Sequence, residues 1–222
     1  MKNLIVQALT KYTAGIILVG LMIFLPAGTF SYSGGWLFMG LLFVPMLILG
    51  IVLLIKAPDL LAKRLINREE QGEQKKVVGL SGLMFLVGFV ICGLDFRWGW
   101  TMVPSVIVVI AAVMLLAGYG LYMEVMRENT YLSRTVEVQE GQKVIDTGLY
   151  GVVRHPMYFA TLIMFLAIPL VLDSCIGFVV FLVYPVLMVK RIKNEEIVLE
   201  EGLAGYREYK EKVKYRMIPF VW

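Results

Sequence analysis

Residues Met102 to Met123 read MVPSVIVVIAAVMLLAGYGLYM, a stretch of 22 residues without a charged side chain. A helix needs about 20 apolar residues to cross the hydrocarbon core of a bilayer, so this stretch predicts a membrane span. The composition of the whole chain points the same way. Of its 222 residues, 59% are hydrophobic, whereas soluble domains are usually about 45–50% apolar. A soluble protein of this length could not bury that excess.

Five further apolar runs flank this stretch and predict helices of their own. They cover Tyr12–Phe30, Trp36–Ile55, Val77–Leu94, Tyr158–Leu172 and Cys175–Val189. The last two are short, and only Asp173 and Ser174 separate them. We therefore expect them to form a tight helical hairpin, which need not cross the bilayer completely. The sequence predicts an all-α fold, a polytopic membrane helical bundle of about six spans.

The distribution of basic residues predicts the orientation in the membrane. With the N-terminus inside, 20 of the 21 lysines and arginines fall on segments that face the cytoplasm, and only Arg97 lies outside. Lysine and arginine are enriched on the cytoplasmic side of membrane proteins. We predict a multi-pass protein of the inner, or cytoplasmic, membrane, surrounded by membrane lipids and without a nucleic-acid partner. Asp95 is expected to pair with Arg97 in an outer turn. The spans leave the oligomeric state open.

Two polar blocks, residues 127–157 and 190–222, flank the predicted hairpin. We expect them to fold together at the cytoplasmic face and to enclose a site. Accordingly, residues 1–126 are predicted to hold the first four transmembrane helices. Residues 127–222 are predicted to form a catalytic region with the cytoplasmic loop, the hairpin and amphipathic C-terminal helices.

His155 is the only histidine of the chain. Metal sites usually take two or more histidine or cysteine ligands, so no metal site is expected. The pair His155-Pro156 indicates the start of a helix, because proline suits the first helical turn. The N–H groups of a helix start can bind an anion such as a carboxylate. The plainer interpretation is a histidine that only caps the helix.

The last apolar run is expected to continue as a helix to about Glu201, with Gly202 and Gly205 ending it before a short helix at 206–215. On this helix Arg191 and Glu195 are four residues apart and therefore share one face. The plainer interpretation is a surface ion pair, which stabilises little. However, ionisable groups at the end of a span usually face a cavity or a partner.

At these residues the chain resembles a known family. The segment Gly148-Leu149-Tyr150-Gly151-Val152-Val153-Arg154-His155-Pro156-Met157-Tyr158 resembles the signature of the isoprenylcysteine carboxyl methyltransferase family. The C-terminal block is similar to the second motif of that family through Arg191, Glu195-Glu196, Leu199, Gly205-Tyr206, Tyr209, Val213, Arg216 and Ile218-Pro219. The segments 95–100 and 218–222 look like those of prokaryotic members. Phospholipid N-methyltransferases share a looser version of these motifs.

The resemblance implies S-adenosyl-L-methionine as methyl donor, S-adenosyl-L-homocysteine as product and no metal. The donor-binding positions of the family fall on Gln142, Lys143, Val144, Ile145, Tyr150, His155, Pro156, Met157, Tyr158 and Glu195. Arg191 takes the position of the arginine that orients the acceptor. Arg191 and Glu195 are thus the implied catalytic residues, in a cytoplasmic cofactor-binding region.

The resemblance predicts methyl transfer to a lipophilic small-molecule or lipidated substrate, as carboxyl O-methylation of an isoprenylcysteine-like substrate. A carboxylate needs no general base, so catalysis would rest on positioning and exclusion of water. A phospholipid amine is the alternative acceptor, and it must first lose a proton, which Glu195 or Glu196 could accept. A non-enzymatic scaffold or transporter is the third hypothesis. The spans have almost no polar residues at mid-depth, which argues against transport.

Overall fold

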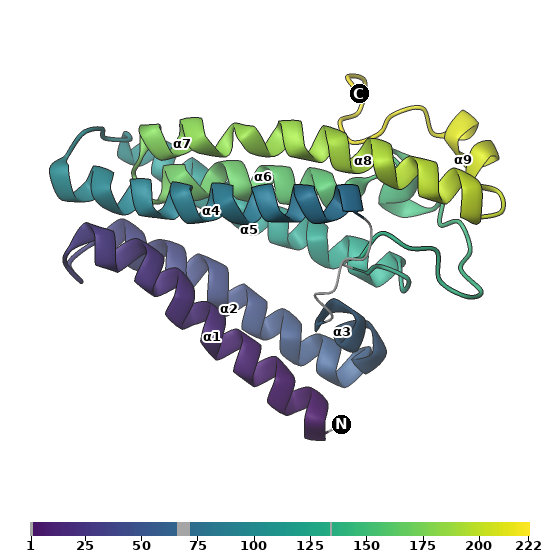
Figure 1. The fold of residues 1–222 in the computed structure, drawn as a ribbon, viewed down its shortest axis with the longest axis horizontal. Helices are drawn as coiled ribbons and strands as arrows, with labels where there is room; N and C mark the ends of the chain where they lie inside the picture. Colours follow the sequence, from purple (N-terminus) through teal and green to yellow (C-terminus); the bar gives the residue numbers. More distant parts are fainter. Residues whose placement is uncertain (1, 66–71, 134) are drawn as a thin grey trace.

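The computed structural model describes residues 2–65, 72–133 and 135–222, and within these ranges its regular structure is helical (Figure 1). The elements are α1 (Lys2–Ala27), α2 (Ser33–Lys56), α3 (Pro58–Leu65), α4 (Gly72–Trp98), α5 (Ser105–Glu128), the 3-10 helix η1 (Gly148–Gly151), α6 (Pro156–Val171), α7 (Cys175–Phe181), α8 (Val183–Gly202) and α9 (Tyr206–Lys212).

Five helical units are long and apolar enough to cross a membrane. They are α1, α2, α4, α5 and the continuous run of α7 and α8. Helix α6 is apolar but has only 16 residues. A helix of that length spans about 24 Å, less than the roughly 30 Å of the hydrocarbon core. The predicted all-α, polytopic membrane bundle is confirmed, with a short second-to-last helix.

Lipid accounts for the outer surface of this bundle. Long apolar side chains such as Leu18, Leu83, Ile110 and Val186 are more than half exposed and lie on four different units of the bundle. Soluble monomers rarely expose contiguous apolar surface on this scale. The exposed apolar side chains are thus the surface that faces the acyl chains.

A proline shapes the last unit. Pro185 has no N–H to donate, and its ring clashes with the carbonyl group four residues earlier, that of Phe181. The helix is interrupted at Leu182 and then continues as α8 to Gly202. The predicted extension of the last span to about Glu201 is therefore confirmed, and α9 follows as predicted but ends at Lys212.

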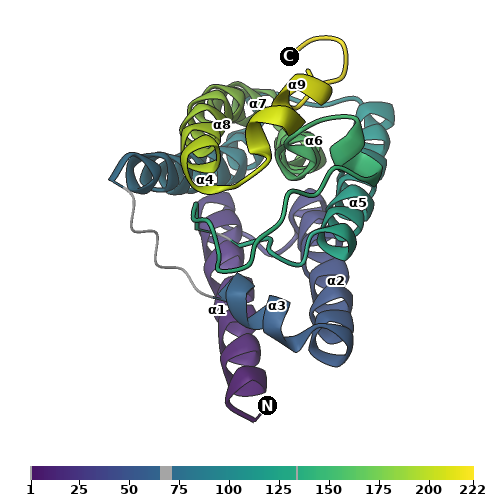
Figure 2. The same ribbon diagram turned by 90° about the vertical axis from the view of Figure 1, so that its right-hand side faces the viewer.

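Figures 1 and 2 show α4, α5, α6 and the α7–α8 unit packed side by side, with α1 and α2 leaning away from them toward one end. Glycine allows a close approach between α5 and α6. A Cβ atom at Gly118 of α5 would lie 3.1 Å from the backbone oxygen of Ala160 in α6 and would clash with the Met164 side chain. Small residues commonly allow membrane helices to pack this closely.

The connections between the helices gather at two ends of the bundle. One end holds the turns between α1 and α2, α4 and α5, and α6 and α7 (Figure 1, left). The opposite end holds the start of α1, α3, the start of α4, η1 and α9. The segments predicted to face the cytoplasm thus share one end, called here the inner end, and the turn with Arg97 lies at the outer end. The side of the membrane that each end faces stays a prediction.

The outer turn differs from the prediction. Asp95 is fully buried and does not pair with Arg97. Its carboxylate accepts hydrogen bonds from the Thr101 backbone N–H at 2.7 Å, the Thr101 hydroxyl at 2.5 Å and the Ser174 hydroxyl at 2.5 Å. The Arg97 guanidinium instead lies over the Trp98 ring. The expected pairing is wrong because the hydroxyl groups of two other turns reach the carboxylate.

Two further differences concern the inner end. Sequence patterns did not predict α3, although Pro58 stands at its first position and the side chains of Leu60 and Leu61 are buried. The first helix also begins earlier than the span predicted at Tyr12–Phe30, since α1 begins at Lys2. Two of the counted basic residues, Arg68 and Arg134, lie outside the described residues. The division at residues 126 and 127 stays a prediction.

Candidate functional site

A pocket at the inner end brings the predicted site residues together. Ten of the eleven line it, namely Gln142, Lys143, Val144, Ile145, Tyr150, His155, Met157, Tyr158, Arg191 and Glu195. The exception is Pro156, which stands at the first position of α6. Two segments that lie about forty residues apart in the chain thus form one concave surface, the arrangement typical of small-molecule sites.

The start of α6 forms one wall of this pocket. Helix α6 begins at Pro156 after His155, as the sequence predicted. The His155 side chain makes no capping hydrogen bond, so the plainer interpretation of a capping histidine is wrong. The C-terminal segment holds the backbone in place, because the N–H groups of Arg154 and His155 donate to the carbonyl oxygens of Tyr215 at 3.0 Å and Arg216 at 2.7 Å. The start of α6 is therefore fixed from the end of the chain.

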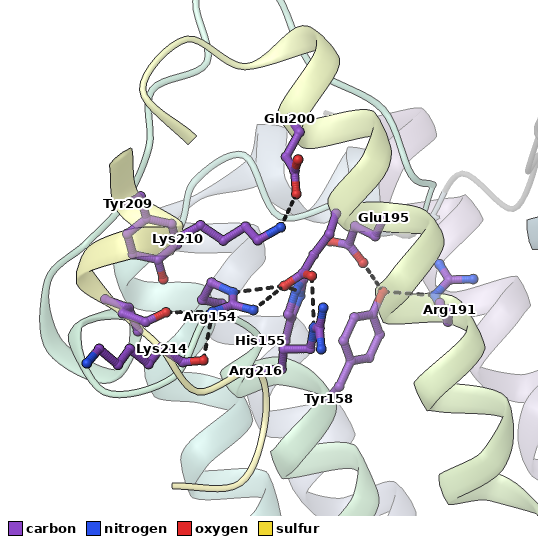
Figure 3. Close-up of polar contacts among 12 residues, drawn as sticks. Arg154, His155, Tyr158, Arg191, Glu195, Glu200, Tyr209, Lys210, Lys214 and Arg216 are labelled. Carbon is purple, nitrogen blue, oxygen red and sulfur yellow. Dashed lines mark hydrogen bonds and ion pairs between the residues drawn. The ribbon is translucent and has the colours of Figure 1, made fainter. Parts of the chain in front are cut away.

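The Tyr158 hydroxyl lies between the two implied catalytic residues (Figure 3). Arg191 Nε donates to it at 2.9 Å, and it donates to Glu195 Oε2 at 2.5 Å. Arg191 and Glu195 share one face of α8, as their spacing predicted, and their connection runs through a tyrosine of α6. Arg191 is buried, which argues against the simple surface ion pair.

A glutamine from α4 also holds Arg191. Gln74 is fully buried, and its side-chain amide makes two contacts with this one residue. Its Nε2 donates to the Arg191 backbone oxygen at 3.3 Å, and its Oε1 accepts from Arg191 Nη1 at 3.1 Å. Gln74 thus orients the guanidinium group. Sequence reasoning missed it, and the signal was a polar residue just before the apolar run that begins at Val77.

Glu196 is the centre of a buried ion network beside the pocket. Figure 3 shows its partners Arg154, His155 and Arg216 close together. Its carboxylate accepts from Arg154 Nε at 2.8 Å and from Arg216 Nε at 2.9 Å, and His155 Nε2 lies 3.4 Å away. Arg154 also donates to the carbonyl oxygens of Val213 and Lys214. Two guanidinium groups favour the ionised carboxylate. The network ties α8, the start of α6 and the C-terminal segment together.

The loop after α5 closes the other side of the pocket. Its residues Asn129, Tyr131, Leu132, Ser133, Thr135, Val136 and Glu137 line it and were not predicted. Asn129 Nδ2 donates to the Tyr150 hydroxyl at 2.9 Å, and Lys63 of α3 donates to Gln139 at 2.7 Å. Helix α3 thereby braces a loop that carries little periodic signal of its own.

An unsatisfied hydroxyl group lies in this pocket. Within the described residues, the Tyr206 hydroxyl is buried and has no hydrogen-bond partner, whereas His155 Nε2 has the Glu196 carboxylate 3.4 Å away. Burying such groups without a partner is costly, and native proteins do so rarely. The pocket also has apolar walls at Leu132, Leu199 and Leu203. Charged, polar and apolar surfaces together fit a zwitterionic nucleoside such as the implied methyl donor.

Comparison with known proteins identifies a family that this chain resembles. Residues 106–204 match the phospholipid methyltransferase family model. This is the family of isoprenylcysteine carboxyl methyltransferase-like membrane methyltransferases, so the resemblance predicted from the motifs is confirmed over this part of the chain. The matched region includes the start of α6 and the face of α8 that carries Arg191 and Glu195. The match implies a membrane methyltransferase, a class that generally uses S-adenosyl-L-methionine, and supports an integral membrane protein.

The chain is also similar to a curated relative with another activity. It is 33% identical over 91 residues to the Delta(14)-sterol reductase TM7SF2 of Mus musculus. The match covers 40% of this chain and 22% of the reductase. The aligned region thus makes up about a fifth of the length of that relative. The two similarities agree on a membrane enzyme that modifies lipids.

Proposed function

We propose that the chain is an S-adenosyl-L-methionine-dependent methyltransferase that modifies a lipophilic acceptor drawn from the membrane. Its reaction is carboxyl O-methylation of an isoprenylcysteine-like substrate. The observation that supports this most is the hydrogen-bonded chain from Arg191 through Tyr158 to Glu195, within a pocket lined by the motif residues. The donor supplies an electrophilic methyl group on its sulfonium sulfur.

The donor-side roles follow from the pocket walls. In the first turn of α6, Pro156 has no N–H, and the N–H groups of Tyr158 and Phe159 donate to the His155 carbonyl oxygen. The Met157 N–H at this helix start suits the carboxylate of an amino acid. Glu195, from the facing helix, accepts hydrogen bonds from amino or hydroxyl groups. Gln142, Lys143, Val144 and Ile145 form the wall between them. These roles would account for a site built on two separate segments.

The acceptor-side role belongs to Arg191. Its planar guanidinium suits a carboxylate, and Gln74 and Tyr158 hold it in one orientation. Because α8 continues from the membrane span into the pocket, an apolar acceptor would reach Arg191 from the lipid side. Alignment of the two reactants and exclusion of water would supply most of the rate enhancement.

The charges near the reacting groups favour a carboxylate over a phospholipid amine. An amine acceptor needs a base to remove its proton. Glu196 is held by Arg154 and Arg216, and Glu195 already accepts a hydrogen bond from the Tyr158 hydroxyl. Within the part of the chain that the structure describes, the two candidate bases are thus engaged. O-methylation, which needs no base, suits this arrangement better.

A lipid reductase is a second candidate, favoured by the aligned region of the sterol reductase. Such an enzyme would take hydride from a reduced nicotinamide nucleotide. The two candidates predict different small-molecule ligands for one pocket. The scaffold hypothesis predicts neither ligand.

Orientation is also part of the proposal. We infer that the pocket faces the cytoplasm, where the donor is available, because the basic segments share its end of the bundle. A cysteine is introduced at the exposed Glu211 of a variant in which the exposed Cys175 is replaced by serine, and its labelling in inverted and right-side-out vesicles tests this directly. Labelling from the outside of right-side-out vesicles would contradict the orientation.

Calorimetric titration of the detergent-solubilised protein tests the function. Wild type is titrated with S-adenosyl-L-homocysteine and, separately, with NADPH. We expect saturable binding of the first that Glu195→Ala weakens and Arg191→Ala largely keeps. Binding of NADPH alone would favour the reductase. If the folded protein binds neither ligand, both enzyme hypotheses are rejected.

A further inference from the structure

Tyr206, the first residue of α9, is a feature that the roles above do not use. Its side chain is 4% exposed and lines the pocket. Its hydroxyl has no hydrogen-bond partner among the residues that the structure describes. Burial, followed by the nearby Glu196 and Glu195 carboxylates, raises its pKa above the usual range, so the hydroxyl keeps its proton at neutral pH. It is a donor held without an acceptor.

The neighbouring tyrosine of the same helix shows what a satisfied hydroxyl looks like here. Tyr209 also lines the pocket, but its hydroxyl donates to the Tyr150 backbone oxygen at 2.7 Å. That bond fastens α9 to the loop before α6. Since Tyr209 already makes this connection, the Tyr206 hydroxyl is not needed for it.

The Tyr206 ring packs among apolar and aromatic side chains, while its hydroxyl lies near the Glu196 and Glu195 carboxylates. Tyr206 packs in a cluster with Leu203, Tyr209 and Val213, and Val144 and Leu199 pack against this cluster. The end of α8 lies close to the facing loop, because a Cβ at Gly202 would stand 2.9 Å from a Val138 methyl group. Where α8 meets α9, the pocket therefore has apolar walls at Val144, Leu199 and Leu203, with the unpaired Tyr206 hydroxyl beside them.

The other end of the pocket has the opposite character. There Tyr158, Arg191 and Glu195 form the hydrogen-bonded chain between the start of α6 and α8. A ligand that fills both ends needs a charged part and a flat, largely apolar part that carries hydrogen-bonding atoms on its edge. The methyl donor has these two parts, an amino-acid group and an adenosine.

We propose that the α8–α9 end binds the adenosine of the methyl donor and that Tyr206 is the residue that hydrogen-bonds it. The adenine ring lies among Val144, Leu199 and Leu203, and the Tyr206 hydroxyl donates to an acceptor atom of the nucleoside. This inference rests on the proposed function, because it assigns one part of the same donor. It gives α9, which the donor-binding positions implied by the resemblance do not include, a direct role in binding.

Two ligands test the assignment. S-adenosyl-L-homocysteine contains both parts of the donor, whereas 5′-methylthioadenosine contains the nucleoside without the amino-acid group. Each is titrated calorimetrically into wild type and Tyr206→Phe, which removes only the hydroxyl. Tyr215→Phe is the matched control, since Tyr215 belongs to the same C-terminal segment but not to the pocket wall. Thermal unfolding confirms that each variant is folded.

We expect Tyr206→Phe to weaken both ligands by a similar factor, about tenfold for one hydrogen bond of about 1.4 kcal/mol. Tyr215→Phe should bind both as wild type does. Unchanged affinity of Tyr206→Phe for both ligands would overturn the inference. A loss confined to S-adenosyl-L-homocysteine would also overturn it, because the contact would then lie at the amino-acid end. Failure of wild type to bind S-adenosyl-L-homocysteine would instead reject the proposed function.

Discussion

Two buried carboxylates stand at opposite ends of this bundle, and their partners differ. Asp95 at the outer end accepts hydrogen bonds from two hydroxyl groups and a backbone N–H. Glu196 at the inner end is held by two arginines, with a histidine nearby. No unsatisfied polar atom is found beside Asp95 in the described ranges, whereas the pocket beside Glu196 holds the unpaired Tyr206 hydroxyl.

This difference separates a structural carboxylate from one that supports a site. Burial alone does not distinguish them, since both side chains are almost inaccessible. At Asp95 the polar groups satisfy one another and join the end of α4 to two turns. At Glu196 the network fixes the walls of a pocket and leaves other polar atoms available for a ligand. Charged partners and unpaired polar atoms are therefore the better marks of a functional site.

Of the substitutions that test this comparison, replacing Glu196 by glutamine should have the largest effect on stability. Arg154 and Arg216 would lose the charge that compensates them, and breaking a buried ion pair costs about 3–5 kcal/mol. We expect a large loss of unfolding free energy, measured by chemical denaturation in detergent. Wild-type stability of this variant would show that the arginines have another counter-charge.

Replacing Asp95 by asparagine should have a smaller effect and leave the site intact. The amide group can no longer accept all three hydrogen bonds, and a buried donor left unsatisfied costs about 1–3 kcal/mol. We expect a fall in thermal stability and unchanged affinity for S-adenosyl-L-homocysteine. A large loss of affinity would mean that the outer end is coupled to the pocket.

Removing the Tyr158 hydroxyl tests how far ligand affinity depends on the hydrogen bonds inside the pocket. Tyr158→Phe leaves Glu195 without its donor and Arg191 Nε without that acceptor. We expect the dissociation constant of S-adenosyl-L-homocysteine to rise about tenfold, or about 1.4 kcal/mol, measured by calorimetry. Phe159→Tyr, which adds a hydroxyl to the next residue, is the control and should not restore affinity when combined with it.

The smallest effect is expected at an exposed ion pair near the pocket. Lys212 of α9 contacts Asp146 at 2.7 Å, and its hydrogen bond lowers the pKa of that carboxyl. Exposed pairs of this kind contribute little because water and salt screen them. Lys212→Ala should keep both the melting temperature and the ligand affinity of wild type. A clear loss of either would show that this exposed pair contributes as much as the buried network does.

Much of the fold could be predicted from the sequence because lipid imposes a simple rule on length and polarity. The uncharged runs gave the helices, and Pro156 gave the start of α6. Helix ends were harder to predict. Helix α1 continues to Lys2 because backbone hydrogen bonds extend a helix beyond its apolar part, where composition no longer marks it. Helix α3 is short and amphipathic, and the basic residues around it obscured its buried leucines.

The site could be predicted in part for a different reason. Helical spacing placed Arg191 and Glu195 on one face, and the family resemblance supplied most of the residues that line the pocket. Spacing could not tell that Glu196 turns toward Arg154 while Glu195 turns toward Tyr158. Gln74 comes from another helix, 117 positions before Arg191. Such contacts depend on packing between helices, which no local pattern encodes.

The Tyr158 hydroxyl has a consequence for the order and strength of ligand binding. Its single O–H donates a hydrogen bond to Glu195, while its oxygen accepts one from Arg191. A ligand that draws Glu195 away thus changes the partner of Arg191, and the reverse is equally true. Thermodynamic linkage then requires that donor and acceptor alter each other's affinity by the same factor. A single phenol would make the two halves of the pocket a reciprocal, cooperative pair.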